Sequence, residues 1–188
     1  MNSETQDWLL TTMSAANVTK IETLQGLWGG YGELLRVHLQ DGRSGSVVLK
    51  DIRFPPPQQK HPRGWSSDFA HQRKLQSYSV ERHWYRAFAQ QCSLACHCPR
   101  AIAVREDAHG QQILLEDLTP IYPVCPDQIK LPEVKLCLSW LAHFHATFMH
   151  VEPTGLWDQG SYWHLATRPQ EWEVMIDGPL KQNASSIE

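Results

Sequence analysis

The sequence has no apolar run that approaches the roughly 20 residues needed to span a bilayer. Its first ten residues, MNSETQDWLL, lack both the basic start and the apolar core of a secretory signal peptide. We therefore expect a cytoplasmic protein that has no membrane segment.

An excess of positive charge is also missing. The formal net charge is -3 at pH 7 and the isoelectric point is about 6.3, which argues against a nucleic-acid or anionic-membrane surface as a binding partner. Because 41% of the 188 residues are hydrophobic and only 20% are charged, the chain is expected to be globular rather than disordered.

The five cysteines do not form the paired motifs of a structural zinc site. Cys92, Cys96, His97 and Cys98 lie close together and could supply thiolate and imidazole ligands, but their spacing matches no paired zinc knuckle. We interpret these cysteines as free thiols that are buried as small apolar side chains near the end of a helix. No metal site is predicted there.

The most informative stretch that is present is Ser46-Val47-Val48-Leu49-Lys50. Three apolar, mostly β-branched residues predict a buried strand that carries one lysine at its end. One interpretation is that Lys50 begins a surface turn together with Asp51. The other is a strand lysine that binds phosphate oxygens and is held by a carboxylate on a neighbouring helix, as in phosphoryl-transfer enzymes.

Glu81 is the candidate for that carboxylate. A helix is predicted over residues 68–91, with a break at residues 77–79 left open, and its apolar residues recur at helical spacing around Glu81. An acid on an apolar stripe requires a partner because an unpaired buried carboxylate is expensive. Lys50 could be this partner, or Glu81 could pair on an exposed face with one of its basic neighbours Arg82, His83 and Arg86.

The strand pattern predicts a five-stranded sheet. Residues 21–27 and 34–39 form a hairpin around a glycine-rich turn, a third strand ends at Lys50, and residues 99–104 and 112–115 form two more strands. The turn contains Gly29, Gly30 and Gly32. Glycines permit positive φ and let backbone amides approach an anion, although such a turn can also be only a turn.

Further helices are predicted over residues 4–16, with Ser3 as the cap, and over residues 131–149. Between Arg53 and Lys74 the sequence contains five basic residues and one acid. This segment fits either a solvated loop or a patch that attracts anions, and the sequence leaves the two open.

Several segments in a fixed order carry a resemblance to a known family. They are Gly29-Gly30-Tyr31-Gly32-Glu33, Val47-Val48-Leu49-Lys50, Ser79-Val80-Glu81-Arg82-His83-Trp84-Tyr85, Leu114-Leu115-Glu116-Asp117-Leu118 and Leu141-Ala142-His143-Phe144-His145-Ala146. Together they resemble the small-molecule kinases of protein-kinase-like fold. The sequence is most similar to the ecdysteroid kinase-like branch, with choline kinases and aminoglycoside phosphotransferases as more distant relatives.

The resemblance implies an α+β fold in two parts. Residues 1–118 would form the nucleotide-binding N-lobe, a five-stranded antiparallel sheet with an N-terminal helix and a helix that bears Glu81. Residues 119–188 would form a linker and the truncated start of a helical C-lobe.

The resemblance also implies ATP as the ligand. Lys50 would bind the α- and β-phosphates, Glu81 would fix Lys50, and the turn with Gly29, Gly30 and Gly32 would cover the phosphates. The backbone from Glu116 to Leu118 would meet the adenine. A complete homologue would transfer phosphate to a small-molecule hydroxyl acceptor.

The catalytic residues of such kinases are missing from the sequence. The family uses a His-x-Asp loop with a following asparagine, and a later aspartate for magnesium, yet none of the ten histidines here has an aspartate two positions on. Asp177-Gly178 is interpreted as a turn, so we assign no catalytic and no metal-binding residue and predict no turnover by this chain. The alternative is a non-catalytic module that binds a nucleotide or a partner, or associates with itself through uncovered apolar residues of its C-terminal part.

Overall fold

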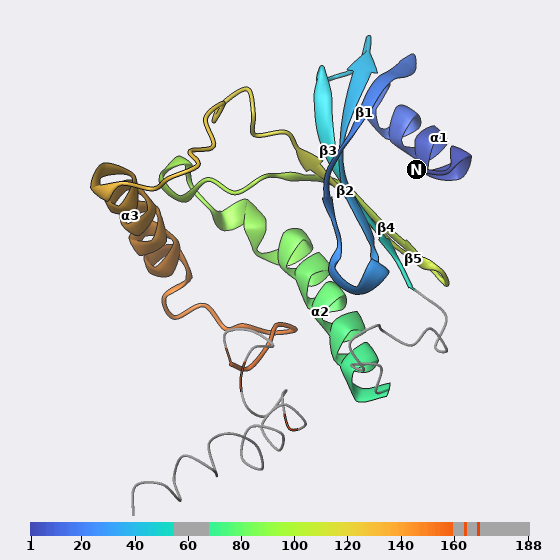
Figure 1. Cartoon of the computed structure of the whole chain (residues 1–188). Coiled ribbons are helices and arrows are strands. Elements are labelled where there is room, and N and C mark those ends of the chain that lie inside the picture. Colours follow the sequence, from blue (N-terminus) through green and yellow to red (C-terminus); the bar gives the residue numbers. More distant parts are fainter. Residues whose placement is uncertain (55–67, 160–163, 165–168, 170–188) are drawn as a thin grey trace, which may run out of the picture.

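The computed structural model describes residues 1–54, 68–159, 164 and 169, and these form an α+β structure (Figure 1). Its sheet has five antiparallel strands in the order β1-β2-β3-β5-β4, which confirms the predicted sheet. The strands are β1 (Asn17–Gly26), β2 (Gly32–Gln40), β3 (Ser46–Arg53), β4 (Ala101–Asp107) and β5 (Gly110–Glu116). The described α-helices are α1 (Ser3–Met13), α2 (Asp68–Ala87) and α3 (Leu131–Phe148).

The main core lies between α1 and one face of the sheet. Alternate residues of a strand point to opposite faces, and the odd-numbered residues Val47 and Leu49 of β3 are fully buried on the α1 side. The buried cluster consists of Leu9, Met13, Leu35, Val37, Leu39, Val47, Leu49 and Leu114. The same alternation directs the even-numbered residues of β3 to the other face.

Helix α1 is held by a cap at one end and by polar contacts beneath it. The Asn2 side chain accepts a hydrogen bond from the Thr5 amide at 2.9 Å, so Asn2 is the cap, and the predicted cap Ser3 is instead the first helical residue. Thr5 is fully buried, and its hydroxyl accepts hydrogen bonds from Arg53 at 3.3 Å and Arg105 at 2.9 Å. These contacts fix α1 across β3 and β4.

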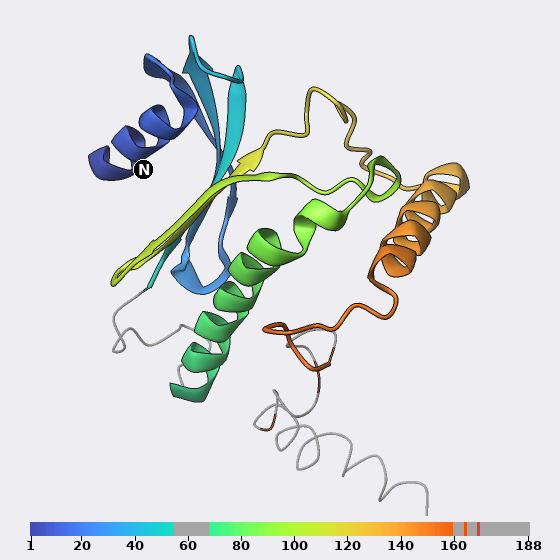
Figure 2. The same ribbon diagram turned by 180° about the vertical axis from the view of Figure 1, so that it is seen from behind.

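Helix α2 lies on the opposite face of the sheet, as Figures 1 and 2 show from two sides. It is continuous through residues 77–79, so the break that the sequence left open is absent. The Ser77 hydroxyl donates to the Lys74 carbonyl at 2.7 Å, so its hydrogen-bonding group is satisfied within the helix. The next residue, Tyr78, is buried. The helix ends at Ala87, and a separate 3-10 turn follows at Ala89–Gln91.

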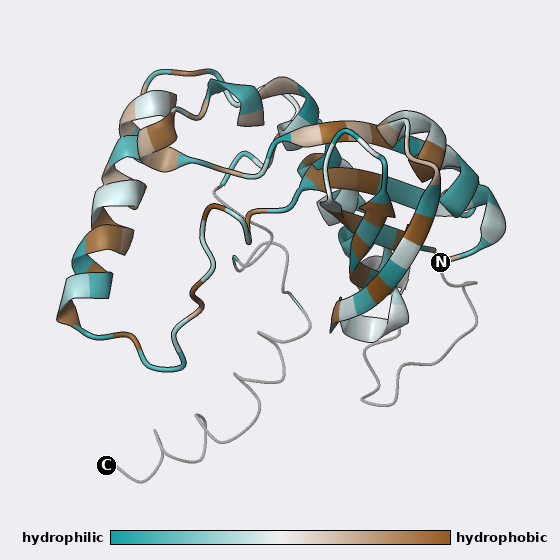
Figure 3. Ribbon diagram, turned by 90° about the horizontal axis from the view of Figure 1, so that it is seen from above, coloured by the Kyte–Doolittle hydropathy of each residue, from teal (hydrophilic) through white to brown (hydrophobic). Residues whose placement is uncertain are grey.

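Helix α3 packs against the short helix η3 (Leu94–Cys96) rather than against the sheet. It meets the last turns of α2 through Phe144, whose ring centroid is 6.4 Å from that of Trp84. Trp140 donates a hydrogen bond from Nε1 to the His97 carbonyl at 3.1 Å, and Phe148 lies with its ring centroid 6.4 Å from that of Phe88. No residue of α3 is buried. Figure 3 shows that apolar positions recur along it, and several of these apolar side chains, among them Leu136 and Leu138, are exposed.

None of the described helices combines the length and the apolar character needed to cross a membrane. All five cysteines are free thiols. Most of the basic segment between Arg53 and Lys74 and the predicted turn at Asp177 fall outside the described residues.

Candidate functional site

Lys50 stands in the middle of the central strand. In the sheet it pairs with Leu34 of β2 and with Ile113 of β5, and β3 continues to Arg53. The prediction that the strand ends at Lys50 is therefore wrong. The strand can include Asp51 because its carboxylate accepts hydrogen bonds from the Gln112 side-chain amide and from Arg53. The even position of Lys50 directs its side chain toward α2, where it is only 17% exposed.

Glu81 is the partner of Lys50. The Lys50 ammonium lies 2.6 Å from Oε1 and 2.7 Å from Oε2 of Glu81, so both carboxylate oxygens accept from one cation. The three basic neighbours of Glu81 have other partners. Arg82 pairs with Glu106, and the His83 ring lies 3.0 Å from the Thr154 carbonyl oxygen. Arg86 donates to the Val104 carbonyl at 3.5 Å. The structure thus decides between the two pairings that the sequence left open.

One cavity, of about 390 Å³, joins this ion pair to the segment after β5. Its apolar lining comes from strands β1, β2, β3 and β5 and from Pro99 and Tyr122. The lining includes Leu24, Leu34, Val48, Leu115 and the segment Glu116–Thr119. A volume within about 300–1,000 Å³ with a mainly apolar wall and a few polar groups is typical of a small-molecule site.

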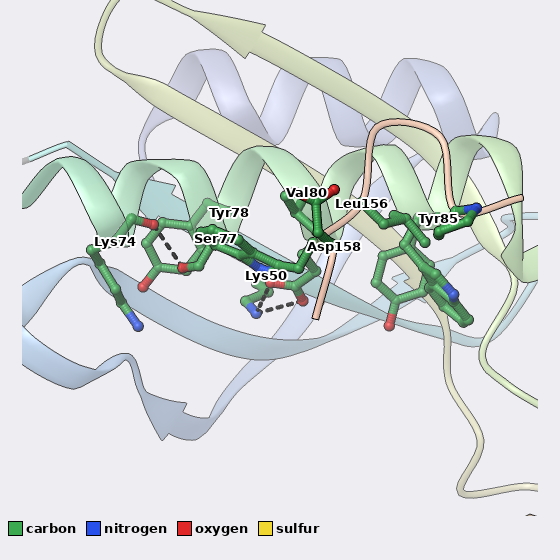
Figure 4. A pocket seen from close by; sticks show the side chains of 12 residues that line it. Lys50, Lys74, Ser77, Tyr78, Val80, Tyr85, Leu156 and Asp158 are labelled. Atoms are coloured by element: carbon green, nitrogen blue, oxygen red, sulfur yellow. Dashed lines mark hydrogen bonds and ion pairs between the residues drawn. The ribbon is translucent and has the colours of Figure 1, made fainter. Parts of the chain in front are cut away.

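A second cavity, of about 670 Å³, lies between α2 and residues 153–158 (Figure 4). Lys50, Glu81 and Tyr85 line both cavities, so the ion pair sits where the two meet. The second cavity adds Lys74, Tyr78, Trp84, Trp157 and Asp158 to its wall. Together the two cavities form one candidate site on the α2 side of the sheet.

Tyr85 contributes a neutral hydroxyl to this junction. Burial, and then the negative charge of Glu81 and the nearby Cys98, raises the pKa of Tyr85 to about 12. Its phenol is therefore protonated throughout the physiological range. It can donate a hydrogen bond to a ligand in either cavity.

Asp117 anchors the segment that lines the smaller cavity. Its carboxylate accepts hydrogen bonds from Arg36 Nε at 2.9 Å, the Ser46 hydroxyl at 2.7 Å and the Thr119 amide at 3.0 Å. Burial alone raises the pKa of Asp117, but the hydrogen bonds from Ser46 and Thr119 and the charge of Arg36 outweigh it and hold the pKa at about 2. The backbone that leaves the sheet is thereby fixed to β2 and β3.

The predicted residues Glu116 and Leu118 flank Asp117 and line the smaller cavity. The Glu116 amide donates to the Arg100 carbonyl at 2.9 Å, and its carboxylate accepts from the Arg100 amide at 3.2 Å. The Leu118 carbonyl accepts from the Ile121 and Tyr122 amides. The turn after β5 is therefore ordered by its own backbone.

The glycine turn lies between β1 and β2, and it requires glycine. Gly29, Gly30 and Gly32 have φ of 77°, 78° and 118°. A Cβ on Gly32 would stand 2.0 Å from the Asp51 carbonyl oxygen, whereas one on Gly30 would meet nothing within 4 Å. None of the three lines either cavity.

Tyr31 links that turn to α2. Its hydroxyl lies 2.6 Å from His71 Nδ1, and its ring centroid is 5.8 Å from that of Tyr78. The Arg53 amide donates to the Tyr31 carbonyl at 2.8 Å. The turn is thus held against the first turns of α2 and the end of β3.

The sequence interpretation missed three contributors to the site. Tyr78 and Tyr85 lie three residues before and four after Glu81, a spacing that places them on its face of the helix. Asp117 was predicted only as part of the backbone that would meet the adenine, since nothing local in the sequence indicates that Arg36 and Ser46 bind its carboxylate.

Among the residues that the structure describes, no three His, Cys, Asp or Glu side chains gather as a metal site. Comparisons of the chain with protein-family models, with curated proteins and with solved structures found no match.

Proposed function

We propose that this chain binds ATP as the kinase-like N-lobe of a small-molecule O-phosphotransferase, in the ecdysteroid kinase-like branch that its sequence resembles. The main support is the contact between Lys50 of β3 and both carboxylate oxygens of Glu81 of α2. A lysine on a central strand that is oriented by a helix glutamate supplies a fixed ammonium for phosphate oxygens.

The smaller cavity supports the adenine part of the proposal. Leu24, Leu34, Val48 and Leu115 supply apolar walls for a planar base, and the backbone from Glu116 to Leu118 supplies polar groups at its edge. Because Asp117 fixes that backbone, a base that docks there would not have to order it first. The cavity ends at Lys50, where the phosphates of such a nucleotide would begin.

The proposal assigns nucleotide binding, and no turnover, to these 188 residues. Lys50 and Glu81 position phosphates, whereas an acceptor hydroxyl and magnesium need the aspartates of a His-x-Asp loop and a metal site, and the sequence contains no His-x-Asp. In a homologue that carries the His-x-Asp loop, a small-molecule hydroxyl would be the acceptor.

The test is calorimetric titration of the chain with ATP, with and without magnesium. Replacement of Lys50 alone would leave Glu81 without its cation, so the variant is Lys50→Met combined with Glu81→Gln. We expect this variant to bind ATP at least about 10-fold more weakly than the wild type, since a charge-assisted contact is lost.

Lys135→Met combined with Glu152→Gln also removes one lysine and one glutamate, both at exposed positions outside the two cavities, and serves as the matched control. Equal ATP affinity in the wild type and the double variant, or no ATP binding by a folded wild type, would refute the proposal. Robust phosphate transfer by the chain would refute the assignment of no turnover.

A second candidate function is self-association through the apolar side of the C-terminal part. Four exposed apolar residues recur every three or four positions along one side of α3: Leu131 (67% exposed), Val134 (38%), Leu138 (58%) and Leu141 (39%). Exposed apolar patches of this kind mark interaction surfaces, and the proposed occupant is a second copy of the chain. A monomer by light scattering at high concentration, with no binding of a hydrophobic dye, would exclude this function.

A further inference from the structure

We propose that Lys74 is a second phosphate-binding residue of this site and that it contacts the terminal phosphates of a nucleoside triphosphate. The inference rests on the proposed binding of nucleotide at Lys50. It extends that site along α2 to a residue that the sequence interpretation placed only in a basic segment.

Lys74, Tyr78 and Glu81 share one face of α2. They are spaced by four and three residues, which puts their side chains above one another on the helix surface. Glu81 on this face reaches Lys50 of the sheet, so the whole face is turned toward the candidate site. Figure 4 shows the side chains of Lys74 and Lys50 directed to the same side of α2.

The ammonium groups of both lysines lie near the ring of Tyr78. The Nζ atom of Lys74 lies 4.7 Å from the ring centroid of Tyr78, and the Nζ atom of Lys50 lies 5.6 Å from the same centroid. Both lysines line the larger cavity. Tyr78 is only 3% exposed, so packing around its ring keeps the ring in one position.

The position of Lys74 indicates which phosphates it would contact. The Tyr31–His71 contact places the glycine turn one helical turn before Lys74, and Tyr31 itself lies beside Tyr78. Lys50 borders the smaller cavity and Lys74 does not. A nucleotide whose base occupies the smaller cavity would pass Lys50 first and reach Lys74 with its outer phosphates.

The charge balance supports a second cation. Glu81 already offsets the charge of Lys50, and Asp158 adds a further acid to the lining of the larger cavity. A triphosphate carries several negative charges, and a single lysine that is paired with a carboxylate compensates little of this charge. Lys74 is the second lysine in the lining of the larger cavity.

The experiment measures the affinities of Lys74→Met for ATP, ADP and AMP by calorimetry, with inorganic tripolyphosphate as a probe that has no base. We expect the affinity of the variant for ATP to fall about 10-fold, its affinity for ADP to fall less, and its affinity for AMP to stay unchanged. The reason is that only the outer phosphates lose a charge-assisted contact. Tripolyphosphate binding should fall as well. Lys74→Arg should retain most of the ATP affinity, and Lys135→Met should retain all of it.

A role of Lys74 in packing on Tyr78 alone would give a different pattern. Lys74→Met would then lower the affinity for the three nucleotides equally or leave it unchanged. Either result would overturn the role of Lys74. The proposed function would still stand if the wild type binds ATP. A folded wild type that binds no nucleotide overturns both.

Discussion

Replacement of Asp117 by asparagine tests whether the carboxylate anchors the segment after β5. The side chain is only 4% exposed, and it accepts from Arg36, Ser46 and the Thr119 amide. The Asp117→Asn variant would keep the shape of the side chain and lose its negative charge. We expect the variant to fold with lower stability, because the Arg36 guanidinium loses its partly buried counter-ion.

The magnitude follows from the pKa of Asp117. Its pKa is about 2 in the folded protein against 3.8 for an unperturbed aspartate. At about 1.4 kcal/mol for each pKa unit, the ionised carboxylate contributes about 2 kcal/mol to the free energy of unfolding. Because the pKa is lowered on folding, this stabilisation is complete above about pH 5 and is lost as the pH falls toward about 2.

The assay is urea unfolding of the wild type and Asp117→Asn between pH 6 and pH 3. The difference in unfolding free energy should be about 2 kcal/mol at pH 6 and about half of that at pH 3, where part of the wild-type carboxylate in the unfolded state is protonated. Asp127→Asn, at an exposed position of the same connector, should show no such difference. A difference that does not change with pH would refute the electrostatic account.

Two further predictions concern the glycine turn. Gly30→Ala should lower the unfolding free energy by about 1 kcal/mol through its positive φ alone, whereas Gly32→Ala should lower it by about 3 kcal/mol or more, since its Cβ would also collide with the Asp51 carbonyl. Equal losses in thermal or urea unfolding would contradict this. In a double-mutant cycle, Tyr31→Phe and His71→Ala should show a coupling of about 1 kcal/mol, as expected for one hydrogen bond. Additive effects would mean that the contact does not hold the turn.

The sequence was informative where local pattern determines structure. Apolar runs bounded by turn residues predicted the five strands, because such runs are visible in any short window. The apolar stripe around Glu81 predicted a helix and the need for a partner. Boundaries were less accurate: β3 runs on past Lys50 to Arg53 because its next residues, Asp51 and Arg53, are polar yet satisfied by side-chain hydrogen bonds.

The pairing of Lys50 with Glu81 shows the limit of the sequence. The sequence supplied both residues and the reason for a partner, but it also allowed Glu81 to pair with its own basic neighbours. Only the packing of α2 on the even-numbered face of β3 brought the two side chains within 2.7 Å.

The sequence by itself determined which segments become strands and helices, since those depend on residues close along the chain. The tertiary structure alone decided the network of Asp117 and the approach of Lys50 to the ring of Tyr78. The physical reason is that these contacts join residues tens of positions apart. Their geometry is set by how a whole helix or strand lies on the sheet, which no local pattern records.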